Sequence, residues 1–174
     1  PKTDYILGLH VKPDLPAGTI GIKYGKVHAS SDTFQITVKG KTSHGAYPEL
    51  GIDSLTASAQ IVTGVQSIIA RNISALNSAV TTIGSIHGGN AVNLIADTVI
   101  LEGTIRSLDY HSRELLKTRL KEMAHWTAQA YGAKAEVKFQ KGYPVLVNDN
   151  LIVDIIKNTA ICETAVEKAV ELKD

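Results

Sequence analysis

Alternation of hydrophobic and polar residues is the clearest pattern in the middle of the chain. Phe34, Ile36 and Val38 are separated by polar residues, which is typical of a strand that buries one face. Every second residue from Val99 to Ile105 is likewise apolar or glycine. Four strands are predicted here, at residues 33–39, 79–87, 97–107 and 134–140.

Two longer segments predict helices. Asp53 is a suitable N-cap for a helix over residues 53–71, and Gly132 is a natural C-cap for a second helix over residues 111–131. The apolar residues that share one face of the first helix are Leu55, Ala59, Val62 and Ile69.

The order strand, helix, strand, strand, helix, strand predicts an α+β fold of the ferredoxin-like βαββαβ type. In that fold two helices cover one face of a four-stranded antiparallel sheet. The edge strands keep open backbone donors and acceptors, so we expect a dimer formed edge to edge.

The N-terminal part of the chain has a different hydrophobic pattern from the central strands. The apolar run at residues 5–10 ends in His10 and predicts a strand buried on both faces. A second strand is expected at residues 19–24. The hydrophobic pattern lapses over residues 25–32, which predicts a domain boundary there.

Past residue 144, Asp149 or Asn150 can cap a further helix. This helix has a wide apolar face, and no other predicted element is left to cover that face. The polar tail from Glu163 to Asp174 is expected to fray.

Composition narrows the classes of partner. Eighteen basic and seventeen acidic residues among 174 give a net charge of +1, which disfavours nucleic acid and membrane surfaces as partners. The single cysteine, Cys162, excludes an internal disulfide framework and fits a reducing compartment, so a cytoplasmic location is expected. No apolar run reaches the roughly 18 residues that span a bilayer. Because the chain begins at Pro1, we expect a piece of a longer protein.

Three polar residues near predicted strand ends are candidates for chemistry. His44, on a glycine-flanked loop, can donate a hydrogen bond to a carbonyl oxygen that becomes negative or to a substrate carboxylate. Arg106 has a planar fork that suits a carboxylate. Taken alone, a surface histidine, a solvated arginine and a turn asparagine at Asn93 are the more ordinary interpretations.

His10 is the best isolated candidate for a metal ligand, because it follows an apolar strand. One ligand does not make a site, and the chain contains neither an H-x-x-H nor an H-E-x-x-H spacing. Cys162 has no basic neighbour within two residues, which favours an inert thiol.

Several motifs, in the same order, resemble the amidohydrolase branch of the aminoacylase and carboxypeptidase-G-like metallopeptidases. Members include hippurate hydrolase and N-acetyldiaminopimelate deacetylase. The resemblance covers about residues 4–149. The motifs are Gly8-Leu9-His10, Leu15-Pro16-Ala17-Gly18-Thr19-Ile20, Ala29-Ser30-Ser31-Asp32-Thr33-Phe34, Gly40-Lys41-Thr42-Ser43-His44-Gly45-Ala46-Tyr47-Pro48, Asn93-Leu94-Ile95 and Gly103-Thr104-Ile105-Arg106.

The resemblance implies a role for each candidate residue. His10 corresponds to a metal ligand, and His44 to a histidine that reaches across a homodimer to polarise the scissile carbonyl. Asn93 and Arg106 correspond to residues that hold the carboxylate end of an N-acyl amino acid substrate. Ala96 departs from the family, which often has proline at that position.

The resemblance also implies a division of the chain. Residues 1–25 would end the first segment of an α/β catalytic domain, residues 26–141 would form a lid and dimerisation domain, and residues 142–174 would return to the catalytic domain. We use the name lid for residues 26–141.

The remaining metal ligands and the general base of the family have no counterpart in the sequence. The parent protein is therefore expected to use a divalent metal such as zinc, manganese or cobalt, whereas this chain alone is expected to bind none and to be inactive.

Two alternatives remain. One is a stand-alone ferredoxin-like module that binds a small molecule or RNA. The predicted strands 79–87 and 97–107 contain no Phe, Tyr or Trp to stack on bases, which disfavours RNA. The other alternative is a purely structural dimerisation unit.

Overall fold

The computed structural model describes residues 2–172 and separates the chain into two compact units. The larger unit is His28–Leu146, and the smaller one combines the segments up to Val27 and from Val147 onward. Two short strands that pair with each other, β2 (Gly25–His28) and β7 (Leu146–Asn148), link the units along the chain.

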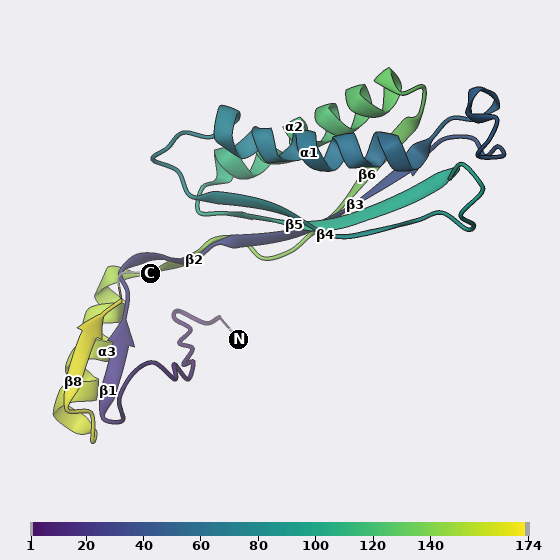
Figure 1. The fold of residues 1–174 in the computed structure, drawn as a ribbon. Helices are drawn as coiled ribbons and strands as arrows, with labels where there is room; N and C mark the ends of the chain where they lie inside the picture. Colours follow the sequence, from purple (N-terminus) through teal and green to yellow (C-terminus); the bar gives the residue numbers. More distant parts are fainter. Residues whose placement is uncertain (1, 173–174) are drawn as a thin grey trace. The chain divides into compact units, whose positions relative to one another are not determined.

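A four-stranded antiparallel sheet forms the larger unit, and both long helices cover the same face of it (Figure 1). The strand order is β4-β5-β3-β6, so β4 and β6 are the edges. This confirms the ferredoxin-like α+β prediction. The elements are β3 (Ser30–Lys39), α1 (Ser54–Asn72), β4 (Ala79–Gly88), β5 (Thr98–Ser107), α2 (Tyr110–Ala130) and β6 (Lys134–Lys141).

The core lies between the sheet and the helices, where the alternation in the sequence places it. Phe34, Ile36 and Val38 from β3 are buried together with the odd-numbered apolar residues of β5. Gly103 interrupts that row on β5, because a β-carbon there would overlap the ring of Phe34 and the carbonyl oxygen of Thr82. The glycine therefore makes room for the largest side chain of this layer.

The predicted buried face of α1 is only partly right, since Val62 and Ile69 pack against the core but the first two residues named do not. Leu55 and Ala59 are exposed, whereas Ser54 and Ser58 are fully buried. Both serine hydroxyls donate 2.7 Å hydrogen bonds to carbonyl oxygens, of Ala96 and Ser54 respectively. A hydroxyl that donates a hydrogen bond can be buried at little cost in free energy. Serines therefore occupy positions on the core side of α1 where apolar residues were expected. The apolar residues on the true core face are Ala57, Ile61, Val65 and Ile68.

A buried carboxylate, Asp32 of β3, binds α2 and the end of β6 at the end of the sheet where β3 begins. Both oxygens of Asp32 accept from Arg113 of α2, at 2.6 Å from Nε and 2.7 Å from Nη2. Lys117 lies 3.2 Å away, and the backbone N–H of Gly142, just after β6, donates at 3.2 Å. The hydrogen bond from Arg113 lowers the pKa of Asp32 to about 2, against the opposing effect of burial.

In the smaller unit, β1 (Thr19–Ile22) pairs in parallel with β8 (Lys168–Glu171), so the expectation of a frayed tail is wrong for these residues. Residues 173–174 of that tail lie outside the described part of the chain. The helix α3 (Asn150–Glu163) is capped by Asp149 and packs against these two strands. Val153 and Ala160 are buried there, so the helix does have an element to cover part of its apolar face.

The strand predicted at residues 5–10 is also wrong. This segment has no regular structure, and its apolar side chains are exposed, with Leu9 at 90%. A strand buried on both faces needs hydrogen-bonding neighbours and covering layers. Within residues 2–172, no strand pairs with this segment.

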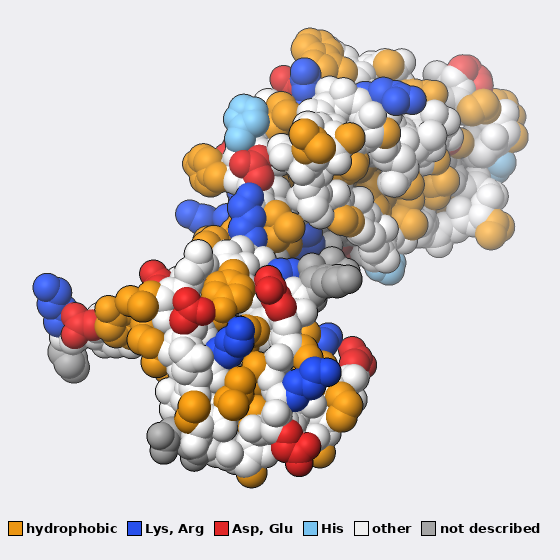
Figure 2. Space-filling view, turned by 90° about the vertical axis from the view of Figure 1, so that its left-hand side faces the viewer, with side chains coloured by type: hydrophobic (Ala, Val, Ile, Leu, Met, Phe, Trp, Pro, Cys, Tyr) orange, Lys and Arg blue, Asp and Glu red, His pale blue; other side chains and the backbone are white. Residues whose placement is uncertain are grey.

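Charges of both signs are interspersed on the face shown in Figure 2, with hydrophobic side chains between them, as the balanced composition predicts. None of the helices between residues 2 and 172 is both long and apolar enough to cross a membrane.

Candidate active site

Two loops meet beyond one end of the sheet, and we call them together the tip. They are residues 40–52, which contain a short 3-10 helix, η1 (Pro48–Leu50), and residues 89–97. The N–H of Gly40 donates to the carbonyl oxygen of Asp97 at 2.7 Å, directly after the last register pair of β3 and β5. The tip therefore continues the pairing of the two central strands.

His44 and Leu94 face each other in an isolated antiparallel bridge within the tip. The flanking hydrogen bonds run from Gly45 N–H to the Asn93 carbonyl oxygen at 2.7 Å and from Ile95 N–H to the Ser43 carbonyl oxygen at 2.9 Å. His44 and Leu94 are thus a non-hydrogen-bonded pair, whose side chains share one face and lie close together. The same bonds hold the backbones of His44 and Asn93 in neighbouring positions, and Asn93 alternates to the face opposite Leu94.

Two glycines of the tip are required by close backbone approach. A β-carbon on Gly40 would overlap the carbonyl oxygen of Ile52, and one on Gly45 would lie 3.2 Å from the carbonyl oxygen of Asn93. Gly40 therefore lets the loop of residues 40–52 close on itself, and Gly45 lets this loop approach residues 89–97 closely.

The imidazole of His44 is exposed but oriented. Its Nδ1 accepts a hydrogen bond from the backbone N–H of Ala46 at 3.1 Å. The ring of Tyr47 lies 5.8 Å away, centroid to centroid, with a tilt of 56°. In the described part of the chain nothing accepts from Nε2, which leaves this nitrogen available to a ligand.

Asn93 is not explained by backbone conformation. Across residues 2–172 only glycines have a positive φ, and in this loop the residue is Gly89, at 84°. The interpretation of Asn93 as an asparagine chosen for an unusual dihedral angle is therefore wrong. No hydrogen bond within the described residues engages its side-chain amide.

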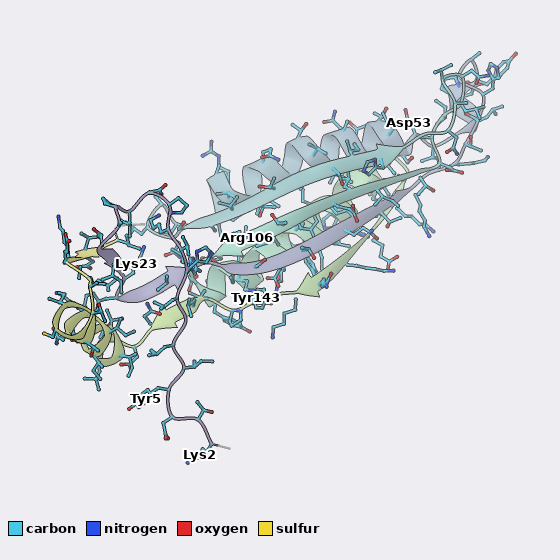
Figure 3. The ribbon with its side chains drawn as sticks, turned by 90° about the horizontal axis from the view of Figure 1, so that it is seen from below. Lys2, Tyr5, Lys23, Asp53, Arg106 and Tyr143 are labelled. Atoms are coloured by element: carbon cyan, nitrogen blue, oxygen red, sulfur yellow. The ribbon has the colours of Figure 1, made fainter. Side chains whose placement is uncertain are left out.

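Arg106 lies at the opposite end of the sheet from the tip. Figure 3 labels Asp53, which begins α1 beside the tip, and Arg106 toward the other end. Arg106 lies eight positions beyond Thr98 on β5, a distance of about 26 Å at roughly 3.3 Å per residue. The half-buried Arg106 donates to the carbonyl oxygen of Ile105 at 3.1 Å and faces Ser31 in the register. One chain therefore brings His44 and Asn93 together and keeps Arg106 apart from them.

His10 belongs to the smaller unit, where its exposed ring has Nδ1 at 2.6 Å from the carbonyl oxygen of Val11. This leaves Nε2 as the nitrogen that a metal ion would find free. Among the described residues, no group of three or more His, Cys, Asp or Glu side chains is placed to hold a metal ion. The chain fits a metal centre only as the donor of one ligand.

Comparison with known proteins identifies the family of the larger unit. Residues 27–132 match the family described as the peptidase dimerisation domain of the M20 group. The chain belongs to the M20 peptidase family. This confirms the resemblance drawn from the motifs, and the tip and Arg106 are parts of an M20 dimerisation domain.

Curated relatives of this M20 chain include deacetylases. The chain is 38% identical over 157 residues to an N-acetyl-L-cysteine deacetylase of Bacillus subtilis, covering 90% of the chain and 38% of that protein. It is 43% identical over 148 residues to an N-acetyldiaminopimelate deacetylase of a Geobacillus strain, covering 85% and 39%. The chain spans about two fifths of the length of these relatives.

Among solved structures, the Bacillus subtilis YXEP protein aligns with a TM-score of 0.72 and 31% identity, over 95% of this chain and 40% of that one. That protein is described as a dinuclear metal-binding peptidase of the M20 family.

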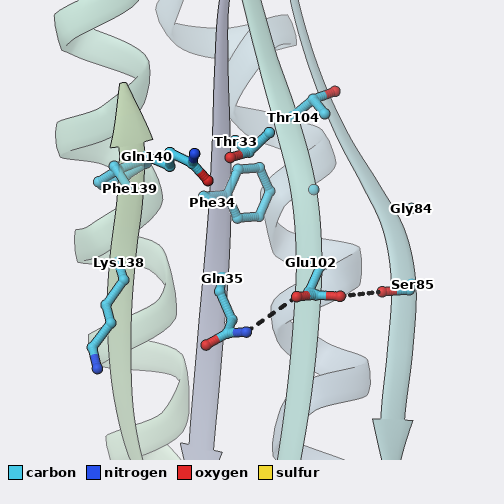
Figure 4. A pocket seen from close by; sticks show the side chains of 11 residues that line it. Thr33, Phe34, Gln35, Gly84, Ser85, Glu102, Thr104, Lys138, Phe139 and Gln140 are labelled. Atoms are coloured by element: carbon cyan, nitrogen blue, oxygen red, sulfur yellow. Dashed lines mark hydrogen bonds between the residues drawn. The ribbon is translucent and has the colours of Figure 1, made fainter. Parts of the chain in front are cut away.

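One hollow of the M20 chain lies away from the tip. A shallow cavity of about 590 Å³ lies on the sheet face that the helices leave open. Figure 4 shows its centre, where Glu102 accepts hydrogen bonds from Gln35 at 3.1 Å and Ser85 at 3.4 Å. These polar contacts are typical of the solvated face of an antiparallel sheet. A second hollow, of about 480 Å³, lies between residues 88–96 and the start of α1.

Reasoning from the sequence missed two groups beside His44. Tyr47 was visible only as part of the motif, and the contact of its ring could not be read from the spacing. The N–H of Ala46 leaves no trace in the sequence, because any residue except proline supplies one.

Proposed function

We propose that this chain is the lid and dimerisation portion of a metal-dependent amidohydrolase that cleaves the amide bond of N-acyl amino acids, of the hippurate or N-acetyl amino acid type. The M20 match and the deacetylase relatives support the reaction class. The observation that carries the proposal is the oriented imidazole of His44, tied through the backbone to Asn93.

His44 would stabilise the negative charge that develops on the substrate carbonyl oxygen by donating a hydrogen bond to it. With Nδ1 occupied by a backbone donor, Nε2 carries the proton and can donate to the carbonyl oxygen as it becomes negative. A divalent metal held in part by His10 would supply Lewis acidity and an activated water when bound. The amide of Asn93 and the guanidinium of Arg106 would hold the substrate carboxylate.

The separation of these residues supports a homodimer. About 26 Å of β5 lies between the two ends of the sheet, too far for one small substrate to contact both. In a two-fold dimer paired antiparallel through one edge strand, the tip of one copy would lie beside Arg106 of the other copy.

The composition of the two edges favours β4 as the pairing strand. Charged side chains blunt the edge at β6, which contains Lys134, Glu136, Lys138 and Lys141. The sequence of β4, AVTTIGSIHG, contains no charged residue. Its ends are Ala79, level with Ser107 near Arg106, and Gly88, level with Val99 near the tip. Antiparallel pairing of two β4 strands therefore brings tip and Arg106 together.

The experiment that tests this function is His44→Ala in the full-length parent protein. Loss of one oxyanion donor is expected to lower kcat by about 10² to 10³-fold while the dimer persists. His111→Ala is the matched control, because His111 is an exposed histidine on α2, and it should leave kcat unchanged. Unchanged catalysis in an intact His44→Ala dimer would favour a purely structural lid.

We further propose that the 174-residue chain does not hydrolyse hippurate or N-acetyl amino acids by itself, even with zinc, manganese or cobalt. One histidine cannot hold a metal firmly enough to lower the pKa of its water toward neutrality. Turnover by the purified chain in an assay of released amino acid would contradict this.

A further inference from the structure

The two candidate histidines use the same ring nitrogen in opposite ways. Nδ1 of His44 lies 3.1 Å from the backbone N–H of Ala46, which can only donate. Nδ1 of His10 lies 2.6 Å from the carbonyl oxygen of Val11, which can only accept. The partner in each case determines whether that nitrogen carries a proton.

A neutral imidazole has a single N–H, so each contact selects one tautomer. His44 must leave Nδ1 unprotonated and carry the proton on Nε2. His10 must carry the proton on Nδ1 and leave the lone pair of Nε2 free. The free nitrogen is therefore a hydrogen-bond donor in His44, whereas in His10 it can accept a hydrogen bond or donate its electron pair to a metal ion.

We propose that the chain holds these two histidines in opposite tautomers, and that the backbone N–H of Ala46 is the positioning group that keeps His44 a donor through Nε2. The tautomers follow from contacts within this chain. Their use rests on the proposed function, in which His44 donates to the substrate oxygen and His10 is a metal ligand.

The surroundings of His44 support a persistent orientation. The N–H of Tyr47 donates to the carbonyl oxygen of His44 at 2.8 Å and closes a turn around Gly45 and Ala46. The N–H of Gly45 donates a hydrogen bond to the carbonyl oxygen of Asn93 across the bridge. If the proton moved to Nδ1, this N–H would face the N–H of Ala46. The N–H of Ala46 would then lose its acceptor, which is unfavourable.

The His10 contact suits metal binding for a separate reason. A ligating histidine commonly donates its other ring N–H to a carbonyl or carboxylate oxygen, which selects the tautomer and orients the ring. Val11 supplies that oxygen from the adjacent residue. The smaller unit thus presents an imidazole with its tautomer already suited to a metal ion.

Nitrogen-15 NMR of the labelled 174-residue chain tests the proposal without metal or substrate. Long-range proton–nitrogen spectra are recorded over a series of pH values, and the tautomers are read where the nitrogen shifts themselves show neutral rings. His44→Gln and His10→Gln each remove one set of ring signals and so assign the two histidines among the six.

The expected result is an unprotonated Nδ1 in His44, a protonated Nδ1 in His10, and a scalar coupling across the hydrogen bond between the amide nitrogen of Ala46 and Nδ1 of His44. The same tautomer in both rings, or no coupling to Ala46, would overturn the proposal. Neither result depends on catalysis, so failure here is distinct from failure of the His44→Ala experiment in the parent protein.

Discussion

Asp32 shows how much of the architecture can depend on one carboxylate. Its side chain is fully buried, and it bonds to α2 through Arg113 and to the end of β6 through Gly142. Two buried opposite charges in two-point contact stabilise the fold only as a pair, because either partner alone would remain desolvated and unpaired.

Replacing Asp32 with asparagine is therefore expected to lower the free energy of unfolding by about 3 kcal/mol, measured by urea denaturation at neutral pH. Glu122→Gln is the matched control. It removes a carboxylate from an ion pair with Arg119 in which both side chains are 47% exposed, and it should cost less than about 1 kcal/mol. Equal losses for the two variants would contradict the importance of burial.

The same carboxylate predicts a pH dependence. The pKa of Asp32 is about 2 in the folded chain, below its ordinary value of 3.8. At any pH above 3.8 the ionised carboxylate therefore stabilises the folded state. That stabilisation is lost as the pH falls through the window between these values. The difference in unfolding free energy between the original protein and Asp32→Asn should shrink as denaturation is repeated from pH 5 to about pH 2. A difference that stays constant would show that Asp32 does not titrate in this window.

Individual elements depend on their ends as well as on their faces. Asp53 accepts hydrogen bonds from the N–H groups of Leu55 and Thr56, at 2.9 and 3.1 Å, and thereby caps α1 as the sequence predicts. The cap directly follows residue 52, where the loop that contains His44 ends.

Asp53→Ala is expected to lower the free energy of unfolding by about 1 kcal/mol, because two N–H groups of the first turn lose their acceptor. Asp53→Asn retains a side-chain oxygen and should cost clearly less. Thermal unfolding followed by circular dichroism measures both, and indistinguishable melting temperatures would contradict a capping role.

At the scale of the whole molecule, the edge strand β4 is predicted to form the dimer interface. Thr82 is exposed near the middle of β4, so in a two-fold antiparallel pair the Thr82 residues of the two copies would lie near the axis. Thr82→Lys would bring like charges together and should shift the proposed dimer to monomer in sedimentation velocity.

Gln140→Lys is the matched control on the other edge, since Gln140 is an exposed polar residue of β6. It should leave the dimer intact. A monomer produced by Gln140→Lys but not by Thr82→Lys would place the interface at β6 instead.

Much of the larger unit could be predicted from local pattern. The alternation around Phe34 and Val99, the N-cap at Asp53 and the C-terminal Gly132 each reflect interactions within a few residues, so the sequence alone locates these elements. The predictions for residues 5–10 and 168–171 failed because strand formation depends on partners that are distant in the sequence. The face of α1 failed because buried hydroxyls look polar until their carbonyl partners are known.

By itself the sequence determined the order of elements, the apolar side of each strand and the motifs that place the chain among M20 peptidases, since these are properties of residue type and spacing. Only the tertiary structure decided that His44 lies beside Asn93 and far from Arg106, and which nitrogen of His44 is engaged. Strand direction, loop pairing and backbone donors set those relations, and they arise from long-range contacts that spacing along the chain does not encode.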